Sequence, residues 1–452
     1  MQLEQEWQQI PVIHLDLSSV KGKENAEDLR RSLALMLSRL DCYIENPKEV
    51  TPGEILEGMI RRLYSETSQQ VVVLVDEYDA PLLGVMHDNE LLDSMRQVMM
   101  EFYQTLKASE AMIKFCFITG VTRLSQVSIF STLNNLTNIS LLPKFSALCG
   151  ITEQELHSAL LPDIEMLAEC YECTSEKMKD ILKTRYDGYH FSEKSPDIYN
   201  PYSLFSAFAN QKVSNYWFET GTPTFLIQMM RKFKYDITSM DGIESTDYAI
   251  NRPTEAMTTI VPLLYQSGYL TIKDYDRETD IYTLGIPNQE VRIGYADGLL
   301  PAYSGLEGED VQAGFALKFW RALKSHDVEQ AMQEMKSYMA GIPYVEGFKK
   351  KLADAATAEG FYEYTMYLIF SMLNVYARTQ VRCAGGRADM VVWMPDTVYV
   401  FELKANGTAQ EALEQIDSKG YAIPYEADGR SVVKVGVKFD PDTRVPESWI
   451  IS

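Results

Sequence analysis

The sequence predicts an α/β protein with a parallel-sheet segment, a helical middle region and a compact C-terminal α/β segment. Three observations lead to this prediction. Apolar strand-like runs alternate with amphipathic helices over residues 11–150, as in a mostly parallel sheet. Helical periodicity dominates from about residue 152 to residue 266 and returns over residues 308–340. A helix, two strands, a second helix and a further strand follow within residues 341–452.

In the first segment, the expected helices are residues 25–40 and 91–106, and the expected strands are residues 11–17, 71–75, 113–119 and 136–142. The run at 71–75 is continuously apolar, which favours a parallel strand buried on both faces. In the middle region, residues 268–274 and 280–286 indicate a β-hairpin. In the last segment, we expect helices at 359–373 and 409–419, and strands at 388–393, 397–404 and 431–437.

The composition limits the class of protein. The 452 residues are too many for a single core, so two or three domains are expected. The net charge of −22 argues against a protein that coats nucleic acid through general positive charge. The acidity is uneven, because residues 349–452 hold 12 Lys and Arg against 14 Asp and Glu. A local basic groove therefore stays compatible with that segment.

The cysteine pattern and the absence of apolar leaders indicate a cytoplasmic protein. The six cysteines are scattered, as in reduced intracellular proteins. Cys170 and Cys173 form a lone C-x-x-C without further ligands, so we do not expect a zinc site. Residues 1–9 are polar and acidic, unlike a signal peptide. No run of about 18 apolar residues is present, so no membrane span is expected.

Polar side chains follow two apolar strands of the first segment. Asp76 ends the run at 71–75, where a carboxylate can orient Mg²⁺ on a nucleotide, and Glu77 is placed to position or deprotonate a water. Thr119 ends the next strand, and Arg123 follows it as a candidate phosphate ligand or a partner of an acidic neighbour. The structural alternative is a strand that runs into an acidic turn. The sequence contains no G-x-x-x-x-G-K-[ST] loop to hold the phosphates.

A second constellation lies near the C-terminus. Asp389 precedes Glu402 by thirteen positions, and Lys404 follows two residues later. Phosphodiester hydrolysis uses a hard cation held by carboxylates and a nearby positive charge that steadies the developing anion. A short hairpin can bring Asp389 to Glu402, and Glu402 and Lys404 share one face of a strand. Leu403 points into the core, and its carbonyl is a further candidate metal ligand. The alternative is a surface hairpin with a paired Glu and Lys.

Long stretches of the chain resemble a bacterial AAA-ATPase-like family that carries a PD-(D/E)XK nuclease-like domain at its C-terminus. The resemblance covers essentially the whole chain. The stretches that carry it are PVIHLDLS (11–18), VDEYDAPL (75–82), FITGVTRLSQVSIFSTLNNLTNIS (117–140), YDGYHF (186–191), YNPYSL (199–204), YWFETGTPTFLI (216–227), LLYQSGYLTI (263–272), GRADMVV (386–392) and FELKANGTAQEALEQIDSKGYA (401–422).

The resemblance implies three domains: a truncated P-loop, AAA-like core at 1–150 without the phosphate loop, a helical, lid- or winged-helix-like region at 151–340, and a PD-(D/E)XK nuclease-like domain at 341–452. It implies DNA cleavage with Mg²⁺ or Mn²⁺. Asp76, Glu77, Thr119 and Arg123 would be nucleotide-binding residues. Family members normally begin with a segment that holds the phosphate loop, so ATP is expected only where that loop is supplied. AAA-type modules often form rings, so a homo-oligomer is compatible with the family.

The resemblance also suggests roles for residues around the second constellation. Gln415 on the following helix would be catalytic beside Asp389, Glu402 and Lys404, and Tyr421 would line the site. Glu359, slightly favoured over Glu363, would add a metal ligand. The competing interpretation is an interaction protein, in which an impaired ATPase-like segment acts as a scaffold or sensor through protein or nucleic-acid binding.

Overall fold

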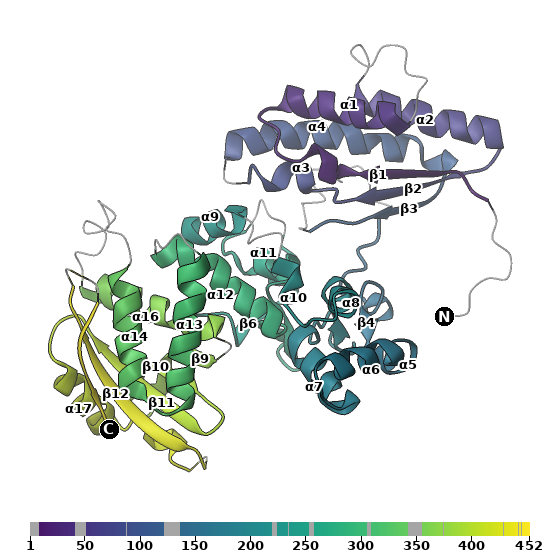
Figure 1. Ribbon diagram of the computed structural model, residues 1–452. Coiled ribbons are helices and arrows are strands. Elements are labelled where there is room, and N and C mark those ends of the chain that lie inside the picture. Colours follow the sequence, from purple (N-terminus) through teal and green to yellow (C-terminus); the bar gives the residue numbers. More distant parts are fainter. Residues whose placement is uncertain are drawn as a thin grey trace.

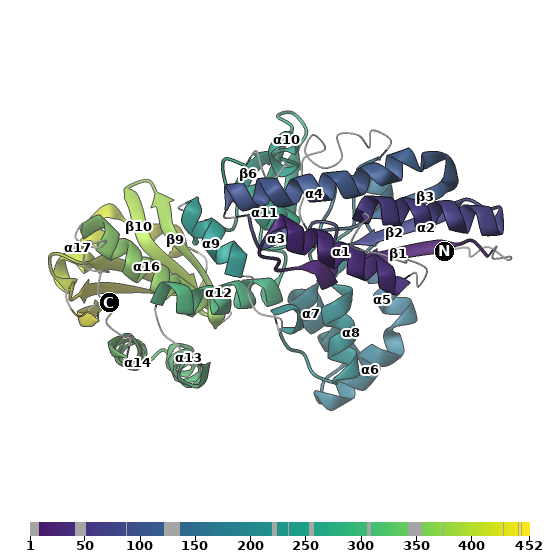
Figure 2. The ribbon, with the colours of Figure 1, turned by 90° about the horizontal axis from the view of Figure 1, so that it is seen from above.

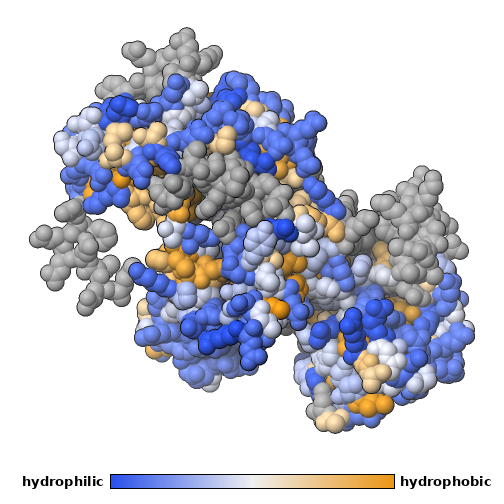
Figure 3. Space-filling model, turned by 180° about the vertical axis from the view of Figure 1, so that it is seen from behind, coloured by the Kyte–Doolittle hydropathy of each residue, from blue (hydrophilic) through white to orange (hydrophobic). Residues whose placement is uncertain are grey.

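The computed structural model describes residues 9–452 except 41–50, 87, 122–135, 219–223, 234, 253–256, 305–308, 342–354, 374, 428, 442 and 444. The N-terminal parallel sheet, a small group of helices and a larger C-terminal assembly follow one another in space (Figure 1). No helix in the described ranges is long and apolar enough to cross a membrane. The visible face in Figure 3 is mainly hydrophilic, with scattered apolar patches.

Parallel pairing in the described part of the first segment confirms the expected α/β arrangement. The sheet has the order β1 (Val12–Asp16), β2 (Val71–Asp76) and β3 (Ile113–Ile118). Four helices accompany it, namely α1 (Ala26–Leu40), α2 (Pro52–Thr67), α3 (Ala80–Leu83) and α4 (Asn89–Ala108). The helix α2 was not expected from the sequence, although Thr51 and Glu54 form a capping box at its start.

The sheet is covered on one face only within the described residues. Val73 and Val75 are buried, and the long helices α1, α2 and α4 lie on that side (Figures 1 and 2). On the other face, the side chains of Val12 and Phe115 are 53% and 54% exposed. The prediction that residues 71–75 are buried on both faces was therefore wrong, because successive side chains of a strand point to opposite faces.

The strand expected at 136–142 was also wrong, because this stretch forms turns. The side chain of Asn138 accepts a hydrogen bond from the backbone N–H of Ser140, and Leu142 donates its own N–H to the carbonyl of Ile139. These local bonds occupy the groups that a strand would use for its ladder. A 3₁₀ turn at Pro143–Phe145 follows.

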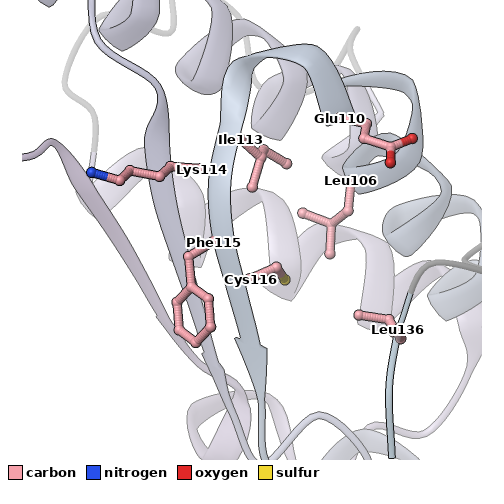
Figure 4. A pocket seen from close by; sticks show the side chains of 7 residues that line it. All are labelled: Leu106, Glu110, Ile113, Lys114, Phe115, Cys116 and Leu136. Atoms are coloured by element: carbon pink, nitrogen blue, oxygen red, sulfur yellow. The ribbon is translucent and has the colours of Figure 1, made fainter.

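A cavity of about 370 Å³ lies along the first half of β3 (Figure 4). Its lining combines apolar residues with one acid and one lysine, namely Leu106, Glu110, Ile113, Lys114, Phe115, Cys116 and Leu136. None of the residues singled out from the sequence as site residues lines this cavity. The carboxyl end of β3, where Thr119 follows, lies beyond it.

The first helical group of the middle region has its own small core. Its elements are β4 (Ile151–Thr152), α5 (Glu153–Ala159), α6 (Leu161–Cys170), α7 (Ser175–Tyr186), β5 (Ile198–Tyr199) and α8 (Pro201–Ala209). The side chain of Asn200 caps α8, whose first residue is Pro201. The Asn-Pro pair is thus the start of a helix, where proline at the first position and asparagine at the cap are favoured.

The second helical group of the middle region is accompanied by a small sheet. Its helices are α9 (Thr224–Lys232), α10 (Asp247–Ile250), α11 (Val261–Gln266), α12 (Gln289–Ser304), α13 (Glu309–Lys324) and α14 (Val328–Ala340). The expected hairpin is present as β7 (Thr271–Asp276) and β8 (Ile281–Gly285), which pair in antiparallel fashion. A strand that the sequence did not predict, β6 (Ile243–Thr246), extends this sheet beside β8.

The described C-terminal residues form a five-stranded sheet in the order β13-β12-β11-β10-β9. Its elements are α16 (Ala355–Met372), β9 (Tyr376–Cys383), β10 (Gly386–Trp393), β11 (Thr397–Lys404), α17 (Ala409–Lys419), β12 (Ser431–Phe439) and β13 (Pro446–Ile451). Val398 and Val400 of β11 pack in one core with α17, whereas Tyr399 and Phe401 pack in another with α16. The two helices therefore cover opposite faces of the sheet.

The C-terminal sheet shares a core with the second helical group. The ring of Phe319 in α13 lies 5.4 Å from that of Phe370 in α16, which lies 5.9 Å from that of Phe401 in β11. The hydroxyl of Tyr399 donates a hydrogen bond to the carbonyl of Leu323, and Trp449 donates one to Glu329. The apolar core thus continues across residue 340, and the boundaries proposed from the sequence stay a prediction.

Candidate functional site

The hairpin of β10 and β11 brings Asp389 beside Glu402. Met390 lies opposite Phe401 in the antiparallel register, so Asp389 and Glu402 are the next residues along the two strands. Oδ2 of Asp389 accepts a hydrogen bond of 2.7 Å from the backbone N–H of Leu403. The short turn at the other end of the hairpin, where Met394 donates its N–H to the carbonyl of Thr397, fixes this register.

The ammonium group of Lys404 lies between two acceptors. Its Nζ is 3.0 Å from Oε1 of Glu402 and 2.8 Å from Oε1 of Gln415. Gln415 projects from α17 and donates a hydrogen bond of 3.3 Å to the hydroxyl of Tyr421. Four of the residues singled out from the sequence therefore form one connected polar chain from the strand to the helix.

Glu402 is a buried acid, with 2% of its surface exposed. Burial raises its pKa, the nearby Asp389 raises it further, and the hydrogen bond from Lys404 acts in the opposite direction. Its second oxygen, Oε2, is buried without a hydrogen-bond partner among the described residues. An unpaired buried carboxylate oxygen is costly, so this atom is poised to accept a cation or a donor.

A second acid reaches the site from α16. Glu363 is 6% exposed, and burial, with a smaller contribution from Asp389, raises its pKa to about 7. Glu359 lies one helical turn earlier in α16, but its side chain is outside the described residues. The acid that the structure places near Asp389 is therefore Glu363, and the role of Glu359 stays a prediction.

Gln380 on β9 is a site residue that the sequence did not reveal. Ala388 and Met390 of β10 pair with Val381 and Thr379 of β9, so Gln380 lies opposite Asp389. Its Nε2 donates a hydrogen bond of 2.6 Å to Oε2 of Glu363. Its backbone has a φ of 52°, a left-handed conformation that residues with a side chain rarely adopt. Its Oε1 is buried and has no partner in the described part of the chain. Such backbone strain often accompanies functional sites.

Two glycines let the β9–β10 turn approach the end of α17. A Cβ atom at Gly385 would overlap the carbonyl oxygen of Lys419, and Gly386 has a φ of 147° beside the hydroxyl of Tyr421. The observed approach is to the carboxyl end of α17, and it holds Tyr421 next to the turn.

The donors present fit a hard cation. No cluster of three His, Cys, Asp or Glu side chains that could hold a metal occurs in the described ranges. The expected ligands within the described residues are the carboxylates of Asp389 and Glu402 and the carbonyl of Leu403, whose side chain is buried in the core, while the fourth expected ligand, the Glu359 side chain, lies outside them. Mg²⁺ commonly binds one or two carboxylates and retains several waters, so a third side chain is not needed.

The N-terminal residues singled out from the sequence are only partly assembled. Thr119 donates a hydrogen bond from Oγ1 to Oδ1 of Asp76, which joins the carboxyl ends of β3 and β2. Glu77 has a φ of 50°, and its Oε2 lies 2.6 Å from Nζ of Lys21, so its carboxylate forms an ion pair. Arg123 lies outside the described residues.

Asp79 supports the same edge of the sheet. It is fully buried, and its Oδ1 accepts a hydrogen bond of 3.1 Å from the backbone N–H of Val121. A Cβ at Gly120 would clash with the ring of Tyr78 and with Asp79, so the loop after β3 packs tightly on the loop after β2. In the sequence, the second aspartate of VDEYD is the signal for this contact.

The fold and the site define the class of the C-terminal domain. A mixed sheet between α16 and α17, with Asp389 on β10 and with Glu402 and Lys404 at the end of the adjacent β11, is a nuclease-like arrangement of the PD-(D/E)XK type. The family model of the PD-(D/E)XK nuclease superfamily matches residues 357–449. A second model, described as a predicted AAA-ATPase, matches residues 1–130.

One relative covers most of the chain. An uncharacterized protein encoded in the vnfD 5′ region of Azotobacter chroococcum mcd 1 is 31% identical over 398 residues, which is 87% of this chain and 74% of the relative. The chain belongs to the AAA-ATPase-like family with a C-terminal PD-(D/E)XK nuclease domain. A solved structure, the ORC2 protein of Aeropyrum pernix, is 13% identical with a TM-score of 0.17, over 62% of this chain and 74% of that one. A structural similarity this weak supports no inference about the fold or function of the chain.

Proposed function

We propose that the C-terminal domain hydrolyses phosphodiester bonds of DNA in a reaction that depends on Mg²⁺ or Mn²⁺. The supporting observation is the position of the Lys404 ammonium, which bridges Glu402 and Gln415 at the end of the hairpin that carries Asp389. Asp389, Glu402 and the carbonyl of Leu403 would hold the cation. The buried Oε2 of Glu402, which has no partner in the described residues, provides an acceptor for it.

Residues of the chain would supply the other contributions to the reaction. A bound cation would supply Lewis acidity toward a phosphoryl oxygen and lower the pKa of a bound water. Lys404 offers a fixed positive charge near the developing phosphorane, and such preorganised charges lower the barrier. Gln415 holds that ammonium in place, and the N–H of Leu403 fixes the orientation of Asp389.

The test is cleavage of plasmid and single-stranded DNA by the purified protein, with Mg²⁺, with Mn²⁺ and with EDTA. We expect metal-dependent cleavage that the Asp389→Ala variant loses. Glu426→Ala is a matched control, because Glu426 is an exposed acid in the same domain. Equal cleavage by the parent and the Asp389→Ala variant, or undiminished cleavage in EDTA, would refute the proposal.

A second proposal concerns the N-terminal segment. The Asp76–Thr119 pair is formed, Glu77 is engaged by Lys21, and the sequence has no glycine-rich phosphate loop. We propose that this polypeptide on its own binds ATP weakly and uses the segment as a scaffold or sensor. Calorimetric titration with ATP and Mg²⁺ is expected to show no micromolar binding. A dissociation constant in the micromolar range would contradict this proposal.

A further inference from the structure

Three arginines are concentrated on the two strands at the open edge of the C-terminal sheet. Arg378 and Arg382 belong to β9, the outermost strand, and Arg387 belongs to β10. All three side chains are exposed. Arg382 lies directly opposite Arg387 in the antiparallel register. We call these three residues the edge arginines.

The edge arginines are electrostatically uncompensated. None of their guanidinium groups forms a hydrogen bond or an ion pair with any residue that the structure describes, whereas the ammonium of Lys434 in the same sheet is paired with Asp417 at 2.7 Å. Like charges directly opposite each other on paired strands destabilise the sheet. In a chain with a net charge of −22, acidic residues are abundant, yet these guanidinium groups have no acidic partner in the described ranges. Their arrangement therefore suits an anionic ligand that binds from outside.

The position of the edge arginines relates them to the nuclease-like site. Arg387 precedes Asp389 by two residues, and Arg382 follows Gln380 by two, so each lies roughly 7 Å along its strand from the site. Guanidinium groups bind phosphate oxygens through two parallel hydrogen bonds and hold their charge at every physiological pH. The phosphates of a nucleic-acid strand bound at the site would therefore lie within reach of these guanidinium groups.

We propose that the edge arginines hold the phosphate backbone of a nucleic-acid strand beside the Asp389 site. This inference rests on the proposed nuclease function, which requires a nucleic acid at that place. Contacts from arginine to phosphate position the strand without reading bases, so the binding is independent of sequence.

A purely structural explanation accounts for only part of the pattern. Charged side chains on an outer strand prevent edge-to-edge aggregation, which would explain Arg378 and Arg382 on β9. It does not explain Arg387, which lies on the inner strand β10 and directly faces Arg382. A polyanion that neutralises both residues of that pair accounts for all three positions.

The test measures binding separately from cleavage. Fluorescence anisotropy of a labelled single strand and of a duplex would be followed in Ca²⁺, on an Asp389→Asn background, between about 50 and 200 mM salt. The triple variant Arg378→Gln, Arg382→Gln, Arg387→Gln is expected to bind at least about tenfold more weakly. Its plot of log K against log salt should be shallower by roughly 2 to 3, since each lost phosphate contact removes about 0.7–0.9.

Two control variants separate charge from folding. The Arg321→Gln variant removes an exposed arginine of α13 and should bind like the parent. The triple arginine-to-lysine variant keeps the charges and should retain most of the salt dependence. Thermal unfolding of each variant, compared with the parent, shows whether the sheet is intact. If an intact glutamine variant binds with the parent's affinity and salt slope, the proposal is overturned.

The outcomes distinguish this inference from the nuclease proposal. If the parent protein binds nucleic acid through the edge arginines but cleaves none with any metal, the nuclease proposal is overturned and the edge arginines remain a nucleic-acid-binding surface. If the parent protein cleaves DNA and the glutamine variant binds DNA with unchanged affinity, only the proposed role of the edge arginines is overturned. Equal competition by polyglutamate and by DNA of the same charge would show that the ligand is an acidic polypeptide, which also overturns the assignment.

Discussion

Gln380 donates a hydrogen bond of 2.6 Å to Glu363, so an amide on the outermost strand holds a carboxylate of α16 at the edge of the site. The two residues are 17 positions apart in the chain and belong to different elements. The backbone of Gln380 adopts its unfavourable φ of 52° where β9 passes Asp389. The bond therefore couples a strained strand to the acidic residues of the site.

Loss of this amide should weaken metal binding more than it weakens the fold. We expect Gln380→Gly to lower Mn²⁺ affinity by about tenfold, because residues that orient ligands typically contribute 10–100-fold. Glycine tolerates the left-handed φ, so the free energy of unfolding should fall less than in Gln380→Ala. Calorimetric Mn²⁺ titration and urea unfolding measure the two effects. Gln410→Ala, on the exposed side of α17, is the control, and unchanged Mn²⁺ affinity in Gln380→Gly would contradict the idea.

Lys404 should be more important for turnover than Gln415. Replacing Lys404 by methionine removes the positive charge and the partner of Glu402, and we expect kcat for DNA cleavage to fall by about 10²–10³-fold. Gln415→Leu leaves the ammonium bound to Glu402 and should reduce kcat by about tenfold or less. Single-turnover cleavage assays at saturating metal compare the two variants. A larger loss for Gln415→Leu than for Lys404→Met would show that Lys404 is structural.

Asp79 should stabilise the N-terminal sheet. Asp79→Ala removes the acceptor of the Val121 N–H in a fully buried place, so the free energy of unfolding should fall by about 1–3 kcal/mol. The exposed acid Glu66 in α2 provides a control, and Glu66→Ala should change stability by less than about 0.5 kcal/mol. Urea denaturation followed by circular dichroism measures both. If the two variants are equally stable, Asp79 does not stabilise the packing of these loops.

Two glycine-to-alanine substitutions should have opposite effects. A Cβ at Gly385 would overlap the carbonyl of Lys419, so Gly385→Ala should displace the β9–β10 turn and lower the melting temperature. A Cβ at Gly360, within α16, meets no atom within 4 Å, and alanine is favoured over glycine in a helix by about 0.5–1 kcal/mol. Gly360→Ala should therefore raise the melting temperature slightly. Calorimetric scans that rank the two variants the other way would contradict the described approach of the turn to α17.

The sequence predicted elements whose ends carry local signals. The helix expected at 409–419 matches α17, because Thr408 and Glu411 form a capping box at its start and Gly420 adopts the left-handed cap at its end. The strand at 397–404 also matches β11, whose residues are almost all buried and apolar. In both cases the information lies within the segment itself.

Two of the elements that were missed, β9 and β13, depend on their neighbours. β9 is an outer strand that mixes arginines with small and polar residues, so its apolar pattern is weak and only pairing with β10 makes it a strand. β13 likewise forms because its residues pair with β12. The left-handed φ of Gln380 has no signature in the sequence, since glutamine is not a residue that favours it. Gln380 could therefore not be recognised as a site residue from the sequence, because β9, the strand that carries it, was itself not predicted.

The continuous core from α13 through α16 to β11 has a consequence for how the protein unfolds and how it can be divided. The rings of Phe319, Phe370 and Phe401 form a continuous series of tilted contacts across the chain segment that separates the middle region from the nuclease-like sheet. These helices and this sheet should melt as a single cooperative unit, and a fragment that begins at α16 would expose their shared apolar surface to water. A displacement of α13 would also reach β11, the strand that carries Glu402 and Lys404, through direct packing.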